Sequence, residues 1–255
     1  MSRVLCIASG KGGVGKTTTA INLGMVFSKH YKQSILMDAN LTTPNVHHHL
    51  GIDQVPYNLQ DALQGKVHVS EAVYKHESGL KLIPLLNTLD EVRNIDLAHF
   101  QEVIKDAKEF SEVLVLDGAA GLGPEAHSAL EVSDEVLIVT CPDKSSLEQA
   151  KRTVELAKDL RLLILGVVLN KVQDKHYELS NEFIECTLGI PIIAEIPHDE
   201  HVPHSQHLKH PVVYAYPNSP SAKAFEKLAF KLMDKEYHPS FQNEALPTKD
   251  KLIAE

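Results

Sequence analysis

The chain has 255 residues, of which 43% are apolar, and this length and composition suit one α/β domain with a well-buried core. Its 25 basic and 34 acidic residues give a formal net charge of −9, which argues against a surface built for nonspecific nucleic-acid binding. The three cysteines are widely spaced and odd in number, so they predict neither a disulfide framework nor a cysteine metal site. We expect no signal peptide before the first strand, and no apolar run nears the roughly 20 residues that span a bilayer, so we expect a cytoplasmic protein.

The first chemically informative stretch is GKGGVGKTTT at residues 10–19, between an apolar run and a segment with helical periodicity. Glycines let backbone N–H groups turn inward around phosphate oxygens, and the following helix N-terminus adds partial positive charge. We expect Lys16 to reach the β- and γ-phosphates and the Thr17 hydroxyl to ligate Mg²⁺. This strand–loop–helix context disfavours an accidental glycine-rich turn. The predicted nucleotide-binding residues of the stretch are Gly10, Lys11, Gly12, Gly13, Val14, Gly15, Lys16, Thr17 and Thr18.

Two short apolar runs end in an aspartate, at Asp38 and at Asp117. In parallel sheets the ligand lies at the carboxyl ends of the strands, so both acids are placed to meet the phosphates. We predict that Asp38 and Asp117 hold Mg²⁺ together with Thr17, although Asp38 could instead be a strand-end turn residue. Gly121 lacks a side chain, so its N–H can approach a γ-phosphate closely.

Further apolar runs alternate with segments of helical periodicity along the chain. This alternation predicts an α/β fold with a doubly wound, mostly parallel sheet flanked by helices in three layers. We expect Ser145 or Ser146 to cap the helix that runs to Leu160. We assign residues 1–236 to this domain and 237–255 to a polar tail that we expect to be flexible. The remaining predicted strands are 80–85, 136–140, 162–169 and 190–197, and the other predicted helices are 59–63, 69–74, 95–110 and one that begins after 217–221.

The segment KGGVGKTT, with Lys11 directly after Gly10, resembles the deviant Walker A motif of the MinD/ParA family, and DGAAGLG at 117–123 resembles its switch II. Among the members, archaeal MinD-like ATPases are the most similar. The resemblance implies a P-loop ATPase that binds ATP or ADP with Mg²⁺ and forms an ATP-dependent homodimer, in which Lys11 reaches the partner's nucleotide. It also implies a role in positioning cell-division or other cellular machinery. Asn170, whose amide suits an adenine edge, would read the base, with Pro197 and Asp199 as adenosine contacts.

The chain departs from the family pattern at Asn40, where a second aspartate usually orients the attacking water. An amide can accept a hydrogen bond from water but carries no charge, so we expect slow hydrolysis with Lys11, Lys16, Asp38 and Asn40 as the catalytic set. The C-terminal tail also lacks the basic amphipathic membrane-targeting helix of bacterial MinD. Peripheral association with a membrane or the nucleoid stays open, the activator or cargo is unidentified, and no specific nucleic acid is predicted.

Two other functions are compatible with the same motifs. One is a nickel-insertion-like ATPase for metal-centre maturation, and the other is an ATP-binding scaffold with negligible hydrolysis. The Cys-x-x-Cys pair of iron–sulfur carriers is absent. Histidines gather at 47–49 and recur every three residues from His198 to His210. Because consecutive histidines point in different directions and a spacing of three drifts around a helix, we favour solvated histidines over a dedicated metal site.

Overall fold

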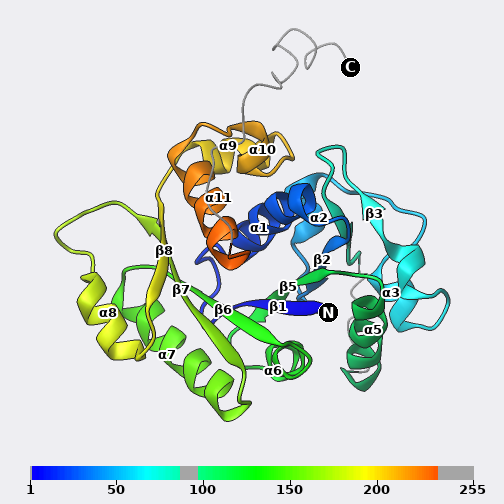
Figure 1. Ribbon diagram of the computed structural model, residues 1–255, viewed down its shortest axis with the longest axis horizontal. Helices are drawn as coiled ribbons and strands as arrows, with labels where there is room; N and C mark the ends of the chain where they lie inside the picture. The colour runs from blue at the N-terminus through cyan, green and yellow to red at the C-terminus, as the bar shows by residue number, and fades with distance from the viewer. Residues whose placement is uncertain (1, 87–96, 235–255) are drawn as a thin grey trace, which may run out of the picture.

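The computed structural model describes residues 2–86 and 97–234, which form one central sheet with helices on both faces (Figure 1). The strand order is β3-β4-β2-β5-β1-β6-β7-β8. All described neighbours run parallel except β3, which runs antiparallel to β4. The predicted doubly wound, mostly parallel sheet is therefore confirmed. The strands are β1 (Arg3–Ser9), β2 (Ser34–Ala39), β3 (Tyr74–Lys75), β4 (Lys81–Ile83), β5 (Val113–Ala120), β6 (Glu135–Thr140), β7 (Leu163–Val172) and β8 (Ile192–Pro197).

The central strands are buried on both faces because their side chains alternate between two apolar cores. In β1, Val4 and Cys6 join one core, whereas Leu5 and Ile7 join the other. The first core is covered by α3 (Leu59–Leu63), η1 (Val69–Ala72), α5 (Leu97–Glu109), α6 (Pro124–Glu131), α7 (Lys144–Asp159) and α8 (Asn181–Leu188). The second is covered by α1 (Lys16–His30), α2 (Val46–Leu50), α10 (Val212–Ala215) and α11 (Pro220–Leu232).

Side-chain caps fix where the longer helices begin. Asp143 caps α7 by accepting a hydrogen bond from the Ser146 N–H at 2.9 Å, so the predicted cap at Ser145 or Ser146 is wrong by two to three positions. Asp143 is the capping residue because its carboxylate can accept hydrogen bonds from both the backbone N–H and the hydroxyl of Ser146. The final helix, α11, is capped by Ser219 and has Pro220 in its first turn.

The predicted helix 59–63 is confirmed as α3, whereas five other short helices were not predicted. The helices α2, α6, α8, α10 and α9 (His201–His207) have between four and eight residues, too few for a 3.6-residue period to be recognised. The first two residues of the predicted helix 95–110 lie outside the described part of the chain, as does the predicted tail 237–255. No helix in the described ranges combines the length and apolar character needed to cross a membrane.

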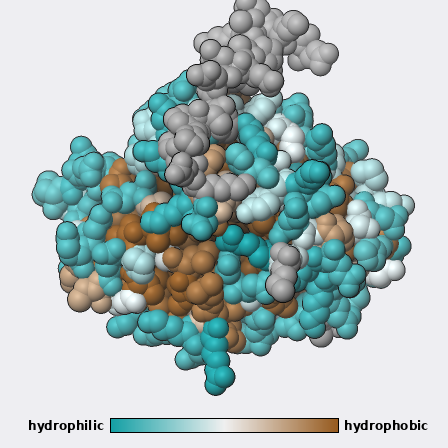
Figure 2. Space-filling model, in the orientation of Figure 1, coloured by the Kyte–Doolittle hydropathy of each residue, from teal (hydrophilic) through white to brown (hydrophobic). Residues whose placement is uncertain are grey.

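The carboxyl edge of the sheet gathers the segments that the sequence singled out. The loop 10–15 leaves β1 there, between the ends of β5 and β6. Asp38 of β2 lies directly beside Asp117 of β5 in the parallel register. Figure 2 shows a mostly hydrophilic surface in this view, with apolar side chains gathered over β7 and β8, where Leu163 is exposed.

Candidate functional site

The loop 10–15 requires glycine at defined positions. Gly13 and Gly15 have φ values of +80° and +95°, in the left-handed region that favours glycine. A Cβ at Gly15 would also overlap the Asn170 side-chain amide, and one at Gly10 would overlap the Gln149 backbone on α7. The loop is therefore packed tightly between α7 and the end of β7.

The end of β7 fixes the loop 10–15 through two hydrogen bonds to its backbone carbonyls. The Asn170 Nδ2 donates to the Val14 carbonyl and the Lys171 Nζ to the Gly13 carbonyl, each at 2.7 Å. The register between β7 and β8 shifts around Lys171, which has a φ of +60°, and such irregularities re-aim side chains. Asn170 and Lys171 thus position the loop, while the predicted adenine contact of Asn170 stays a prediction.

A buried charge cluster lies beneath the loop. The Lys16 Nζ is 2.6 Å from the Asp117 Oδ1, and the Asp117 side chain is 0% exposed. Asp38 accepts hydrogen bonds from the N–H groups of Asn45 and Val46 at 3.0 Å and of Asn40 at 3.2 Å. Burial, and then the neighbouring Asp117 carboxylate, raise the pKa of Asp38 to about 7. Two carboxylates with one lysine leave this cluster short of positive charge.

The residues of the cluster fit a magnesium ion. The Asp117 Oδ2 is a buried oxygen with no hydrogen-bond partner among the described residues. Carboxylate and hydroxyl oxygens are the donors that Mg²⁺ prefers, and Thr17 lines the cavity above the cluster. The site can therefore accept Mg²⁺ through Asp117, Asp38 and Thr17, directly or through waters.

A cavity of about 530 Å³ opens beside the loop, a size typical of small-molecule sites. Lys11, Lys16 and Lys171 all line it, although the whole protein carries a net charge of −9. This local excess of positive charge suits an anionic ligand such as a nucleotide. The predicted site residues that line the cavity are Lys11, Gly12, Gly13, Gly15, Lys16, Thr17, Thr18, Asn40, Asn170, Pro197 and Asp199, whereas Gly10, Val14, Asp38, Asp117 and Gly121 lie outside its lining.

Two predicted contacts have other partners in this structure. The Gly121 N–H donates to the Ser9 carbonyl at 2.9 Å, so a γ-phosphate contact would require this hydrogen bond to open. Asp199 accepts hydrogen bonds from Ser221 Oγ at 2.7 Å and from the His201 N–H at 2.9 Å. Partial burial acts to raise the pKa of Asp199, but these hydrogen bonds outweigh it and hold the pKa well below its usual range. Asp199 therefore joins the end of β8 to α11, and its adenosine contact stays a prediction.

Several site residues were not predicted from the sequence. Asp143 lies 3.8 Å from the Lys11 Nζ, and the Gln206 Nε2 donates to the Thr18 Oγ1 at 3.2 Å. Lys171 could have been found, because it directly follows Asn170 at a strand end. Gln206 lies on the seven-residue α9 and carries no local signal, so only the tertiary structure brings it to the loop.

The histidines do not act as one group. His201 pairs with Asp199, and His204 Nδ1 lies 2.7 Å from the Tyr216 hydroxyl. His210 instead faces His76 and Glu77, two residues far from it in the sequence. Three histidines of the three-residue repeat, His201, His204 and His210, therefore have different partners.

Comparison with known proteins gives the family. The model of the ParA family, described as NUBPL iron-transfer P-loop NTPase, matches residues 1–233. An uncharacterised ATP-binding protein of Methanocaldococcus jannaschii is 33% identical over 237 residues, covering 93% of this chain and 90% of that protein. The crystal structure of the Pyrococcus furiosus cell division ATPase MinD matches with a TM-score of 0.86 and 33% identity, over 92% of this chain and 99% of that one. The septum site-determining protein MinD of Pyrococcus horikoshii, complexed with Mg-ADP, matches with a TM-score of 0.85 and 31% identity, over 91% and 96%. The chain belongs to the ParA family of P-loop NTPases.

Proposed function

We propose that this protein is a Mg-ATP-binding ATPase that acts as an ATP-gated homodimer switch in positioning the division site or other cellular machinery. Its nucleotide site rests on the loop 10–15, on Lys16, and on the Asp38–Asp117 pair that fits Mg²⁺. The MinD structure with Mg-ADP supports the same ligands here. The observation that carries the dimer is Lys11, a second lysine inside the phosphate loop.

The exposure of Lys11 supports a role toward a neighbouring subunit. Its side chain is 43% exposed, and its one ion pair in the described part of the chain, with Asp143, is long at 3.8 Å. Exposed ion pairs contribute between about 0 and 1 kcal/mol, so Lys11 can leave Asp143 at little cost. When ATP is bound, a second copy would bring its own nucleotide within reach of this lysine.

The dimer is tested by size-exclusion chromatography with light scattering, with and without Mg-ATP. We expect a monomer without nucleotide and a dimer with it, and we expect Lys11→Ala to bind ATP but remain a monomer. Lys105→Ala is the matched control, since Lys105 is an exposed lysine on α5 beside Ser133 and Asp134, which precede β6 at the opposite edge of the sheet. A monomer that ignores ATP, or a Lys11→Ala dimer equal to the wild type, would contradict the switch.

Slow hydrolysis is proposed from Asn40. Its Nδ2 donates to the Thr43 carbonyl at 2.6 Å, and its Oδ1 accepts from the Thr43 hydroxyl at 3.1 Å. Both ends of the amide are therefore occupied in holding the loop after β2. The amide carries no charge and cannot accept a proton, so it can only orient a water weakly.

ATP turnover of Asn40→Asp should exceed that of the wild type, by roughly tenfold or more if the missing carboxylate is the limiting group. Phosphate release at saturating Mg-ATP measures this. Gln54→Glu, which adds the same charge at an exposed residue between α2 and α3, should leave turnover near the wild-type value. Equal rates in Asn40→Asp and wild type would remove the argument for slow hydrolysis, and with it the reason for considering a scaffold with negligible turnover.

A role in metal-centre maturation has weaker support. The described cysteines are all free, and burial raises the pKa of Cys6 to about 12, which makes this thiol a poor metal ligand.

We place the protein in the cytoplasm, with an unidentified activator or cargo.

A further inference from the structure

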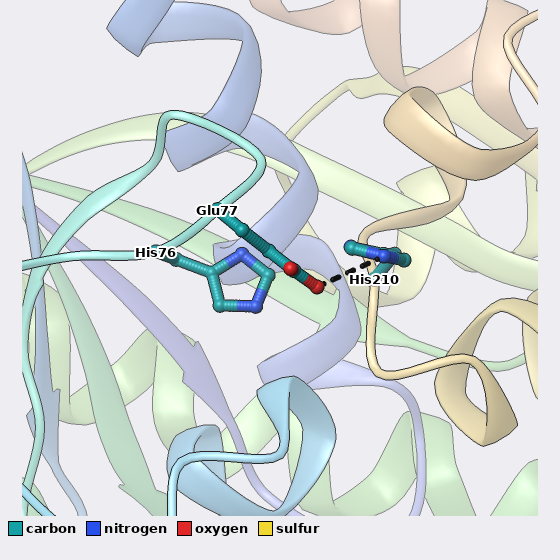
Figure 3. A group of neighbouring side chains, drawn as sticks. All are labelled: His76, Glu77 and His210. Atoms are coloured by element: carbon teal, nitrogen blue, oxygen red, sulfur yellow. Dashed lines mark ion pairs between the residues drawn. The ribbon is translucent and has the colours of Figure 1, made fainter. Parts of the chain in front are cut away.

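His76, Glu77 and His210 bring three metal-ligating side chains together outside the nucleotide cavity (Figure 3). One ligand atom from each lies within 4.8 Å of the other two. Two imidazoles and one carboxylate are a donor set typical of zinc and related divalent transition metals, and not of Mg²⁺. We propose that these residues form a binding site for one divalent transition-metal ion of the Zn²⁺ or Ni²⁺ class.

Both ring nitrogens of His76 have hydrogen-bond partners, which fix the tautomer of the ring, and Nδ1 also lies 2.8 Å from the Ser78 hydroxyl. The Ser78 N–H can only donate, at 3.2 Å, so the His76 Nδ1 accepts and carries a lone pair. The Leu50 carbonyl can only accept, so the Nε2 carries the proton and donates at 3.1 Å. Metal-ligating histidines usually donate their second N–H to a carbonyl or carboxylate in this way. The metal would replace the Ser78 hydrogen bonds at Nδ1 and keep the bond to Leu50.

His210 and Glu77 supply the other two ligands. The His210 Nε2 lies 3.2 Å from the Glu77 Oε1, drawn as the dashed line in Figure 3. In a tetrahedral site with bonds near 2.0–2.1 Å, ligand atoms lie roughly 3.4 Å apart, so this pair already has the required spacing. The Glu77 side chain is 72% exposed and can move to close the site. The His210 Nδ1 is buried and has no hydrogen-bond partner among the described residues, which leaves this ring with an unused polar atom.

Both imidazoles favour the neutral form that a metal requires. Burial, and then the neighbouring His210, lower the pKa of His76. Burial lowers the pKa of His210, although Glu77 acts in the opposite direction. The rings are 5.5 Å apart between centroids, so protonating both would place two positive charges side by side. A divalent ion replaces these protons without that repulsion.

The site joins parts of the chain that are distant in sequence. His76 and Glu77 follow β3, in the turn before β4, whereas His210 lies between α9 and α10. Leu50, which holds the His76 ring from behind, is the last residue of α2. The α9–α10 connection also contacts α2 itself, because the Lys209 Nζ donates to the His48 carbonyl at 3.0 Å. A bound metal would therefore cross-link the turn after β3 to the α9–α10 connection.

The test is isothermal titration of Zn²⁺ into the full, metal-stripped chain at pH 7.5, without nucleotide. We expect one equivalent bound with micromolar or tighter affinity. His210→Ala and Glu77→Gln should each weaken this binding at least tenfold. His207→Ala is the matched control, because His207 is an exposed histidine three residues from His210, and it should bind like the wild type.

Two further measurements separate a built site from adventitious histidine binding. Co²⁺ should give the absorption bands of a low-symmetry site in wild type and His207→Ala but not in His210→Ala. Zn²⁺ should raise the melting temperature of the wild type and leave that of His210→Ala unchanged.

Glu77 is exposed, so Glu77→Gln tests the site without risk to the core, whereas His76 is only 4% exposed and its removal could unfold the chain. No stoichiometric binding, or equal affinity in all four proteins, would overturn the proposal. Neither result depends on ATP binding or dimerisation.

Discussion

Asp38 is a buried carboxyl group that lies beside a second one, Asp117, in the parallel register of β2 and β5. Backbone N–H groups of Asn40, Asn45 and Val46 stabilise its charge, but burial and Asp117 outweigh them and raise its pKa to about 7. An aspartate in the unfolded chain has a pKa near its ordinary value of about 4. Between these values the folded protein keeps a proton that the unfolded chain has lost. Folding stability therefore falls as the pH rises through this window.

Urea unfolding at pH 5 and pH 8, without nucleotide or metal, measures this effect. The free energy of unfolding of the wild type, relative to that of Asp38→Asn, should fall by on the order of 2 kcal/mol between these pH values, because the asparagine of the variant does not titrate. Asp106→Asn, an exposed aspartate on α5, should show no such relative change. Mg-ADP should reduce the fall in the wild type, since Mg²⁺ favours the ionised carboxylate. A relative stability that does not change with pH would show that Asp38 ionises normally.

At the scale of elements, the end of β7 acts on the loop that follows β1. Asn170 and Lys171 each donate to a loop carbonyl, and the Asn170 amide fills the space that a Gly15 side chain would need. Strand-end residues of β7 thus set the shape of a loop more than 150 residues earlier. This geometry gives Asn170 a positioning role in addition to the base contact that the family resemblance implies.

Nucleotide selectivity distinguishes the two roles of Asn170. We expect Asn170→Ala to weaken ADP and GDP by similar factors, roughly tenfold each, because a buried carbonyl loses its donor at a cost of about 1–3 kcal/mol and the loop loosens. Titration with fluorescent nucleotides measures both affinities. Asn181→Ala, which removes an exposed hydrogen bond to Glu195, is the control and should bind like the wild type. A loss confined to ADP would assign Asn170 to base reading and reject the positioning role.

At the scale of the whole molecule, charge is distributed unevenly. The chain carries a net charge of −9, yet Lys11, Lys16 and Lys171 converge on one cavity at the carboxyl edge of the sheet. Parallel strands create this arrangement, since they bring the loops after β1, β2, β5, β7 and β8 to the same edge. Lysines far apart in the sequence thus form one anion site in an acidic protein.

The sequence alone determined the fold class and the centre of the site. The glycine spacing of the phosphate loop, the apolar runs ending in Asp38 and Asp117, and the alternation of strands and helices are local patterns, so they can be recognised without coordinates. The same patterns assigned Lys16 and Asp117 to one site, and the structure brings these two side chains within 2.6 Å of each other. They found the five-residue α3 but not α2, α6, α8, α9 and α10, which have eight residues or fewer and are stabilised mainly by packing.

Only the tertiary structure decided which residues surround that centre. Gln206 reaches Thr18, Lys171 reaches Gly13, and His210 meets His76 and Glu77 across long sequence separations. No local pattern encodes these contacts, because each depends on where α9, the chain after it and the end of β7 lie in the folded protein. The histidine repeat shows the same limit. Its spacing could not indicate that His210 finds its partners on a turn much earlier in the chain.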